Sequence, residues 1–534
     1  MIKARLLRLD PYILALIFLT IFGFILRIYG LGQQSLWYDE GYSINAAMAM
    51  LDKGLPVLPS GAFYSHGILN TSLIAASMGM FGKTEFAARL PGVIFGTLTI
   101  PLAFFFAQKI GGKRTALITA FLVTFLAIEI AWSRQARMYQ QLQFFYILSL
   151  YLFYLFTQKR SSKLLALTII STICAVLSHT YGFSLILVYV AYLLLINIKN
   201  IPRYINDGLF KRKQTIIFLM CLALLLILGQ VLFHVFSSAW GIKMNYFTEY
   251  TDYLTEILPV ILYLGAVGIV IMMKRDFRTS LLLLLALIIP FYFICFHVKL
   301  LAMRYLYFIL PVIFIYFAYT VTYICDALAD ALIRRRDGTA KAKAEDPASG
   351  KRTRPALLRS YLSPALTVII IGLSLHGSGF SFLPHSVYYL DSTAPQPDFK
   401  TAYGFINDNL EEGDIIIDTW PAVGSFYLEK TPDYWLAFDI VGTNGVYCVG
   451  DDNSHECYTN ISCIKSTGDL EALVNASPSG WLVIDGLAAY RLPQSTVAFI
   501  EGNLTYYKEG SSAIAGTIKV YGWPNRSEAS EDTQ

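Results

Sequence analysis

Two adjacent carboxylates, Asp39 and Glu40, follow the first long apolar stretch and lie within the run Gln33–Ser43. Carboxylates at a membrane boundary are costly to desolvate unless they are paired or used. Such a group can act as a general base that takes a proton from an attacking hydroxyl or amine. For Asp39 alone, a solvated or helix-capping side chain is an equally good interpretation, so the pair indicates an enzyme only together with other residues.

The loop that carries this pair, residues 31–85, is long and rich in functional groups. Its segment 42–51 has helical spacing and is expected to lie along the membrane surface. The loop also holds His66, which taken alone is typical of a packing or hydrogen-bonding histidine. Glu85 could simply cap the helix expected to start at Phe86, where the helix dipole favours a negative charge.

Basic residues at the ends of later spans form a second set of candidates, namely Arg134, Arg137, Lys299 and Arg304. The charge pattern places them on the outer side, where positive charges are scarce, so they need a particular reason to be there. A lipid-linked phosphate is one reason, because Arg binds phosphate through paired hydrogen bonds and Lys binds it as a point charge. The alternative is an internal salt bridge to one of the acidic residues Glu129, Glu249, Asp252 and Glu256.

Apolar runs must position these groups. The chain of 534 residues is 55% hydrophobic and only 15% charged, whereas a soluble protein has about 25% charged residues. This predicts a polytopic α-helical membrane protein. Eleven spans are predicted, at about 11–30, 86–108, 115–132, 140–157, 164–178, 183–198, 215–236, 256–273, 279–296, 305–325 and 361–378. The shorter stretch 66–82 is interpreted as an interfacial or re-entrant helix.

The distribution of basic residues predicts the orientation of these spans. With the N-terminus inside, the cytoplasmic pieces hold 26 Lys and Arg and the outer loops of the membrane domain hold seven, as the positive-inside rule requires. The sequence therefore predicts a transmembrane domain at 1–378 and an extracytoplasmic soluble domain at 379–534. Glycosylation sequons at Asn70, Asn460, Asn475, Asn503 and Asn525 all fall on the predicted outer side.

The region 379–534 is acidic, and its patterns predict a small α/β domain. Residues 399–410 have helical spacing, while 413–418 and 481–485 read as short buried strands. The region contains Cys448, Cys457 and Cys463, for which one disulfide is expected, with the third thiol free or paired elsewhere.

These features together resemble a known family. The chain is similar to the membrane glycosyltransferases of the GT-C fold, in particular the family-39-like branch that includes protein O-mannosyltransferases and the aminoarabinose transferase acting on lipid A. The resemblance rests on Trp37-Tyr-Asp-Glu-Gly-Tyr42, Gly82-Lys-Thr-Glu-Phe-Ala-Ala-Arg-Leu-Pro91, Ser133-Arg-Gln-Ala-Arg-Met-Tyr139, Ser178-His-Thr-Tyr-Gly182 and Arg304-Tyr-Leu306.

The resemblance implies site roles. Asp39 would be the catalytic base with Glu40 beside it, and Glu85 would position the acceptor or donor. Arg137 and Arg304, with Arg134 and Lys299, would hold the donor phosphate. The substrate pocket would be lined by His66, His179, Tyr181 and Tyr139. Whether a cofactor takes part is left open, because Asp39, Glu85 and His66 could supply ligands to a divalent cation.

The function implied is inverting transfer of a sugar from a polyprenyl- or dolichyl-phosphate donor to a protein, glycan or lipid acceptor at the outer membrane face. The membrane would be the plasma membrane of an archaeon or bacterium, or the endoplasmic reticulum. The alternative is a transporter or flippase of polyprenyl-linked sugars, which would be expected to show inverted repeats and helices broken at the midplane. Nothing in the sequence indicates nucleic-acid binding.

Overall fold

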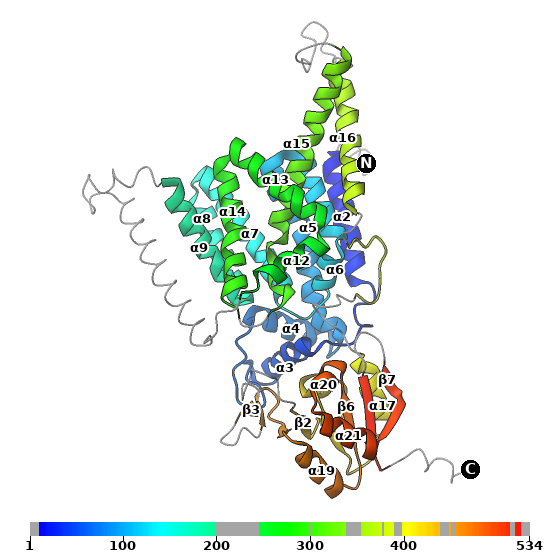
Figure 1. Cartoon of the computed structure of the whole chain (residues 1–534). Coiled ribbons are helices and arrows are strands. Elements are labelled where there is room, and N and C mark those ends of the chain that lie inside the picture. The colour runs from blue at the N-terminus through cyan, green and yellow to red at the C-terminus, as the bar shows by residue number, and fades with distance from the viewer. Residues whose placement is uncertain are drawn as a thin grey trace, which may run out of the picture. The chain divides into compact units, whose positions relative to one another are not determined.

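The computed structural model describes residues 10–197, 245–298, 301–337, 354–375, 379–388, 398–437, 448–449, 455–512 and 518–524. The chain forms two compact units that interleave along the sequence (Figure 1). A helical unit comprises Met1–Arg27, Ile94–Trp132 and Tyr139–Pro384. A mixed unit comprises Ile28–Val93, Ser133–Met138 and His385–Gln534, so it joins the long first loop to the C-terminal region.

Long apolar helices build the helical unit. Its elements are α2 (Pro11–Ile28), most of α5 (Glu85–Phe125), α6 (Ala127–Ser133), α7 (Tyr139–Lys159), α8 (Ser162–Ser178), η1 (Thr180–Phe183), α9 (Ser184–Asn197), α12 (Phe247–Ile257), α13 (Pro259–Arg275), α14 (Phe277–Phe296), η3 (Met303–Ile309), α15 (Leu310–Asp337) and α16 (Arg354–Leu375). In this unit α7 packs on α8, and α15 packs on both α13 and α16.

Most predicted spans coincide with helices of the described residues. Five helices are long and apolar enough to cross a membrane, or six if the bent pair α12–α13 counts as one span. Within α5, Gly112 has a φ of 81°, so the chain breaks where the sequence predicts the loop 109–114. The predicted span 215–236 lies outside the described residues, and eleven spans with the N-terminus inside stay a prediction.

The mixed unit begins with two helices of the first loop, α3 (Tyr38–Lys53) and α4 (Ile68–Phe81), which pack on each other. Asp39 and Glu40 lie in the first turn of α3, where the helix dipole favours negative charge. The helix ends at Gly54, whose φ of 75° suits glycine. Helix α4 corresponds to the stretch predicted as interfacial or re-entrant.

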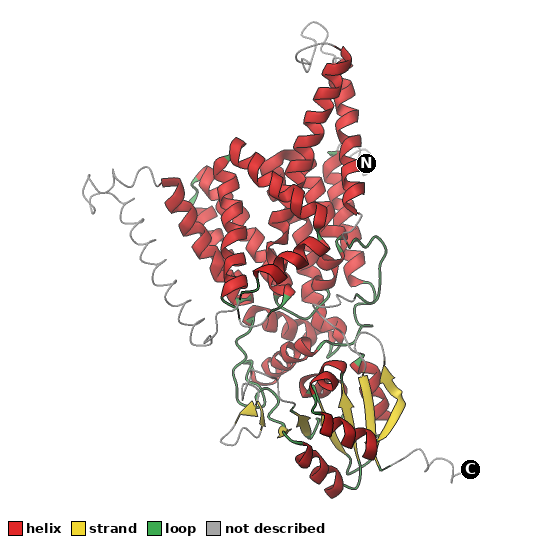
Figure 2. Ribbon diagram, viewed as in Figure 1, coloured by secondary structure: helices red, strands yellow, loops and turns green. Residues whose placement is uncertain are grey.

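The C-terminal part of the mixed unit is an α/β fold, and the described strands are confined to it (Figure 2). Its elements are α17 (Phe399–Asp408), β1 (Ile415–Asp418), α18 (Pro421–Tyr427), β2 (Tyr434–Leu436), β3 (Cys448–Val449), β4 (His455–Glu456), β5 (Ser462–Ile464), α19 (Thr467–Ala476), β6 (Gly480–Ile484), α20 (Gly486–Arg491), α21 (Gln494–Asn503), β7 (Thr505–Ser512) and β8 (Ile518–Trp523). The predicted helix and both predicted strands are confirmed as α17, β1 and β6.

These strands form one eight-stranded sheet in the order β3-β4-β5-β2-β1-β6-β8-β7. The central pairs β2–β5, β1–β2 and β1–β6 are parallel, and the outer pairs are antiparallel. One hydrophobic core joins sheet residues such as Ile416 and Val483 to Ile44 of α3 and Ile74 of α4. The first loop and the C-terminal region therefore share a core.

Two expectations, on the glycosylation sequons and on the cysteines, change or stay open. Asn70 is only 2% exposed inside α4, so this sequon is not accessible in the folded chain, whereas Asn460, Asn475 and Asn503 are exposed. Asn525 lies outside the described residues. The sheet pairs Cys448 with Glu456, the residue before Cys457, and the disulfide among the three cysteines stays a prediction.

Asp418, at the end of β1, is a buried carboxylate whose ionisation opposes folding. It accepts hydrogen bonds from Tyr403 Oη and from the Trp420 amide, each at 2.9 Å. Burial nevertheless raises the pKa of Asp418 to about 7, so the folded state prefers the protonated form. Its contribution to stability is full below the unfolded pKa near 4 and is lost as the pH rises through 7.

We therefore predict that Asp418→Asn changes the pH dependence of unfolding. The unfolding free energy of the wild type, relative to that of the variant, should fall by up to roughly 4 kcal/mol between pH 4 and pH 8. Denaturant titrations of the detergent-solubilised protein at several pH values measure this difference. Glu471→Gln, at an exposed carboxylate of α19, is the matched control and should give a flat difference; a flat difference for Asp418→Asn would contradict the assignment.

Candidate active site

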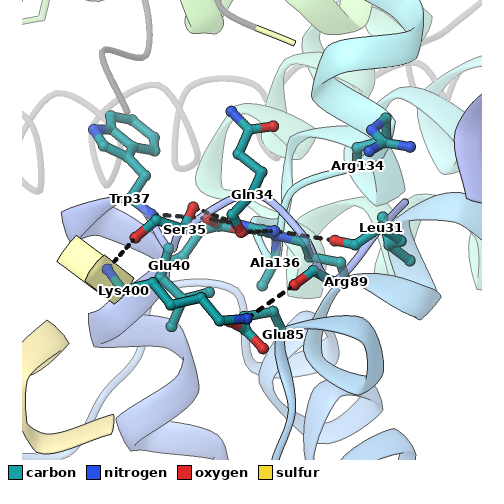
Figure 3. Close-up of polar contacts among 12 residues, drawn as sticks. Leu31, Gln34, Ser35, Trp37, Glu40, Glu85, Arg89, Arg134, Ala136 and Lys400 are labelled. Carbon is teal, nitrogen blue, oxygen red and sulfur yellow. Dashed lines mark hydrogen bonds and ion pairs between the residues drawn. The ribbon is translucent and has the colours of Figure 1, made fainter. Parts of the chain in front are cut away.

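A buried ion pair between Glu40 and Arg89 lies at the start of α3 (Figure 3). Arg89 Nη2 is 2.7 Å from Glu40 Oε2, and Arg89 Nε donates to Oε1 at 2.8 Å. The backbone amides of Trp37 and Ala136 donate to the same carboxylate at 3.0 and 2.8 Å. Glu40 is 0% exposed, so its oxygens face four protein donors and its contacts are structural.

The remaining donors of Arg89 reach backbone carbonyls of the segment before α3. Nη1 donates to Leu31 O at 3.1 Å and to Gln34 O at 2.7 Å, and Nη2 donates to Ser35 O at 2.9 Å. Arg89 was not among the site residues predicted from the sequence. The signal was nevertheless present, because Arg89 lies in one of the stretches that carry the family resemblance.

Asp39, the neighbour of Glu40, belongs to a different set of contacts. Its side chain is 15% exposed, and its Oδ2 lies 3.5 Å from Arg137 Nη2. Arg137 Nη1 also donates to Asp39 O and Ser43 Oγ, both at 2.9 Å, and to Tyr64 Oη at 3.2 Å. The structure thus brings together two predicted site residues that are 98 positions apart.

His66 adjoins this cluster. Its ring lies edge-on to that of Tyr64, with 5.6 Å between the centroids. Desolvation by the surrounding protein lowers the pKa of His66, and the positive charge of Arg137 lowers it further, while Asp39 acts in the opposite direction. The imidazole is therefore neutral at neutral pH and can donate or accept a hydrogen bond beside Asp39.

Glu85 makes other contacts than those its predicted role suggested. Its Oε1 pairs with Lys400 Nζ at 2.8 Å and accepts from Tyr427 Oη at 3.1 Å (Figure 3). Both partners come from the C-terminal region. Among the residues that the structure describes, no three His, Cys, Asp or Glu side chains are grouped as metal ligands, so the set Asp39, Glu85 and His66 considered for a cation is not assembled.

Arg134, which the sequence predicts as a phosphate ligand, contacts backbone carbonyls and a tyrosine ring. It donates to Tyr29 O at 2.6 Å and Ser386 O at 2.7 Å, and its guanidinium lies 5.2 Å from the centre of the Tyr388 ring. Burial lowers the pKa of Arg134 to about 10, helped by the nearby charge of Arg89. These contacts join the first loop to the C-terminal region.

The other predicted residues gather within the helical unit. Arg304 Nε donates to Tyr139 Oη at 3.0 Å, and the Tyr139 ring lies 5.6 Å from that of His179. His179 in turn lies 4.5 Å from Tyr181. The centre of the Tyr305 ring lies 5.2 Å from the centre of the Tyr181 ring and 5.5 Å from Cζ of Arg304. Four residues predicted from three separate stretches therefore form one cluster, while Lys299 lies outside the described residues.

A small cavity adjoins the cluster on the side of Tyr181. It measures about 20 Å³ and is lined largely by apolar side chains, from Thr180, Tyr181, Phe183, Ser184, Leu187, Pro290 and Phe293. A cavity of this size has room for about one water molecule, so it marks an apolar wall beside Tyr181 and not a ligand pocket.

The fold has known counterparts. ArnT from Cupriavidus metallidurans, in a crystal structure with bound undecaprenyl phosphate, superimposes with a TM-score of 0.56 at 15% identity, over 96% of this chain and 97% of that one. The oligosaccharyltransferase AglB from Archaeoglobus fulgidus, in complex with an inhibitory peptide and a dolichol-phosphate, gives a TM-score of 0.53 at 14% identity, over 93% and 72%. These likenesses establish the GT-C fold.

Sequence comparison narrows this class. Residues 65–233 match the family model described as dolichyl-phosphate-mannose-protein mannosyltransferase. An uncharacterized protein of Aquifex aeolicus is 29% identical over 159 residues, which are 29% of this chain and 32% of that protein. The chain therefore has the GT-C fold and matches the mannosyltransferase family model over residues 65–233, in agreement with the resemblance predicted from its motifs.

We predict that the Glu40–Arg89 pair contributes strongly to the free energy of unfolding. Arg89→Met should lower the free energy of unfolding by about 3–5 kcal/mol, because it leaves a buried carboxylate without its counter-ion. The double variant Glu40→Met/Arg89→Met should recover part of that loss. Denaturant unfolding in detergent measures both.

The exposed pair Lys519–Glu501, at 3.5 Å, provides the control for this prediction. Lys519→Met should cost less than about 1 kcal/mol, as for exposed ion pairs generally. Equal losses for Arg89→Met and Lys519→Met would show that the buried pair contributes no more than a surface contact.

Proposed function

We propose that this protein is an inverting glycosyltransferase that moves a sugar from a polyprenyl- or dolichyl-phosphate donor to an acceptor at the outer membrane face. The observation that carries the proposal is the pair of Asp39 and Arg137. Asp39 is a partly exposed carboxylate whose orientation is set by a guanidinium at 3.5 Å, next to a Glu40 that is fully occupied by structural contacts. The GT-C fold and the partial family match support the same class of reaction.

In the proposed reaction the acceptor's hydroxyl or amine attacks the anomeric carbon and the bond from that carbon to the phosphate oxygen breaks. Asp39 accepts the proton of the attacking group as general base. Attack from the face opposite the phosphate inverts the configuration. The leaving group is a lipid phosphate that is already anionic, so it needs positive charge more than a proton donor.

The helical unit is assigned the donor. Arg304, held by Tyr139 at 3.0 Å, offers its guanidinium to the phosphate, and the apolar side chains beside Tyr181 are assigned to contacts with carbon atoms of the lipid or sugar. Arg137 is assigned mainly to orienting Asp39. Glu40 and Arg134 are assigned to holding the backbone around the site rather than to the chemistry.

Asp39→Asn tests the base. It should lower the turnover of labelled sugar by about 100-fold or more, as loss of a general base does, while binding of the donor lipid changes little. The assay supplies radiolabelled mannosyl-phosphoryl-undecaprenol or mannosyl-phosphoryl-dolichol in proteoliposomes, with membranes from a deletion strain as acceptor. Asp52→Asn, at an exposed carboxylate at the end of the same helix, is the matched control. Normal transfer by Asp39→Asn would reject the base, and labelled lipid that crosses the bilayer without sugar transfer would favour a flippase.

Arg304→Ala tests the donor site independently of turnover. Loss of a charge-assisted hydrogen bond should weaken binding of undecaprenyl phosphate by roughly 10- to 100-fold. Native mass spectrometry or ligand-induced thermal stabilisation measures this affinity. Arg278→Ala, at an exposed arginine of α14, should bind as the wild type does; equal affinities for Arg304→Ala and wild type would remove Arg304 from the donor site.

A further inference from the structure

The turn between β4 and β5, Glu456–Ile461, is held by hydrogen bonds to a buried carboxylate. Glu456 is 3% exposed, and its Oε2 accepts the amides of Tyr458 and Thr459 and the hydroxyl of Thr459. The Glu456 amide donates to Ile461 O at 2.8 Å. Asn460 adopts a φ of 62°, a left-handed conformation that asparagine tolerates well. One carboxylate thus holds the turn in a single shape.

This turn presents Tyr458 to the first loop. The Tyr458 ring lies 4.4 Å from that of Tyr42 in α3 and 6.4 Å from that of Tyr64. A hydrogen bond adds to these ring contacts: the side chain of Ser60 donates from Oγ to Cys457 O at 2.5 Å. The turn therefore contacts α3 and the chain after it at three points, all within the mixed unit.

Tyr64 connects this turn to the residues around the candidate base Asp39. It is 4% exposed, and its hydroxyl lies 3.2 Å from Arg137 Nη1 and 3.4 Å from Ser43 Oγ. Arg137 is the residue that holds Asp39. The Tyr458 ring packs against Tyr64 and therefore limits the positions of the Tyr64 hydroxyl. Because this hydroxyl accepts from Arg137, it limits the positions of the Arg137 guanidinium in turn.

Long side chains such as arginine lose considerable rotamer freedom when they are held in one position. A displacement of about 1 Å in a reacting group can cost on the order of 100-fold in rate. A rigid turn that restricts Arg137 through one aromatic neighbour would therefore have a measurable effect on the reaction, although it lies in the C-terminal region and far from Asp39 in sequence.

We propose that Tyr458 is a positioning residue of the active site: supplied by the C-terminal region, it holds Tyr64 and thereby the Asp39–Arg137 pair in their working arrangement. This proposal rests on the proposed function for its kinetic consequence but not for its structural one. The C-terminal region is then part of the catalytic machinery.

The test compares Tyr458→Ala, Tyr458→Leu and Tyr458→Phe in the full-length protein. Hydrogen exchange is followed in peptides that cover residues 38–45 and 60–68, with β6 as internal reference. Turnover and the KM for mannosyl-phosphoryl-undecaprenol are measured on the same samples. Tyr506→Ala, at a tyrosine of β7 that is 49% exposed, is the matched control.

We expect Tyr458→Ala and Tyr458→Leu to exchange faster at 38–45 and 60–68 with β6 unchanged. Their kcat should fall about tenfold with the donor KM within twofold of wild type. Tyr458→Phe, which keeps the ring, should restore both, and Tyr506→Ala should match the wild type.

Three outcomes would overturn the proposal: unchanged exchange at 38–45 and 60–68, faster exchange of β6 to the same extent, or failure of Tyr458→Phe to restore the wild-type behaviour. If the wild type itself transfers no sugar, the proposed function fails, and the exchange data still decide whether Tyr458 orders the Asp39–Arg137 pair.

Discussion

The buried ion pair between Glu40 and Arg89 is the interaction on which the architecture of the mixed unit depends. Taking two opposite charges out of water is costly, and the cost is offset only when every donor and acceptor finds a partner. Here the carboxylate accepts from Arg89 and from the amides of Trp37 and Ala136, while the guanidinium also reaches carbonyls of residues 31–35. Three segments far apart in the sequence therefore meet at one charge pair, which fixes the position and direction of α3.

This anchoring gives two neighbouring carboxylates opposite environments. Successive residues of a helix point about 100° apart, so a helix fixed by Glu40 must direct Asp39 elsewhere. Glu40 is 0% exposed, whereas Asp39 keeps 15% of its side chain accessible beside Arg137. The Glu40 carboxylate is enclosed by four protein donors, which leaves no room for a substrate, whereas the Asp39 side chain keeps part of its surface accessible. Both residues are carboxylates, so the structural role of Glu40 and the proposed catalytic role of Asp39 follow from where their side chains lie.

The sequence predicts local features well and long-range partners poorly. Apolar runs located helices such as α7 and α14 to within a few residues, because hydrophobic length and spacing are local properties. The family resemblance assigned Asp39 and Arg137 to one site, as base and as phosphate ligand, and did not predict that they form an ion pair. The role of Arg89 was missed, since a charge inside an apparent span does not reveal its partner. The sequence also did not predict that Arg134, assigned to a phosphate, donates to backbone carbonyls. Backbone acceptors have no signature in a sequence.

The shared core explains why these long-range contacts exist at all. Helices α3 and α4 are too short and too mixed in composition to bury their apolar faces alone, and their Ile44 and Ile74 pack in one cluster with Ile416 and Val483 of the sheet. Removing the C-terminal region would expose that face to solvent at a cost of about 25 cal/mol for each Å² of apolar surface. The first loop therefore requires the sheet in order to fold, and any element of the sheet that contacts α3, such as the turn bearing Tyr458, can act on the residues that α3 carries.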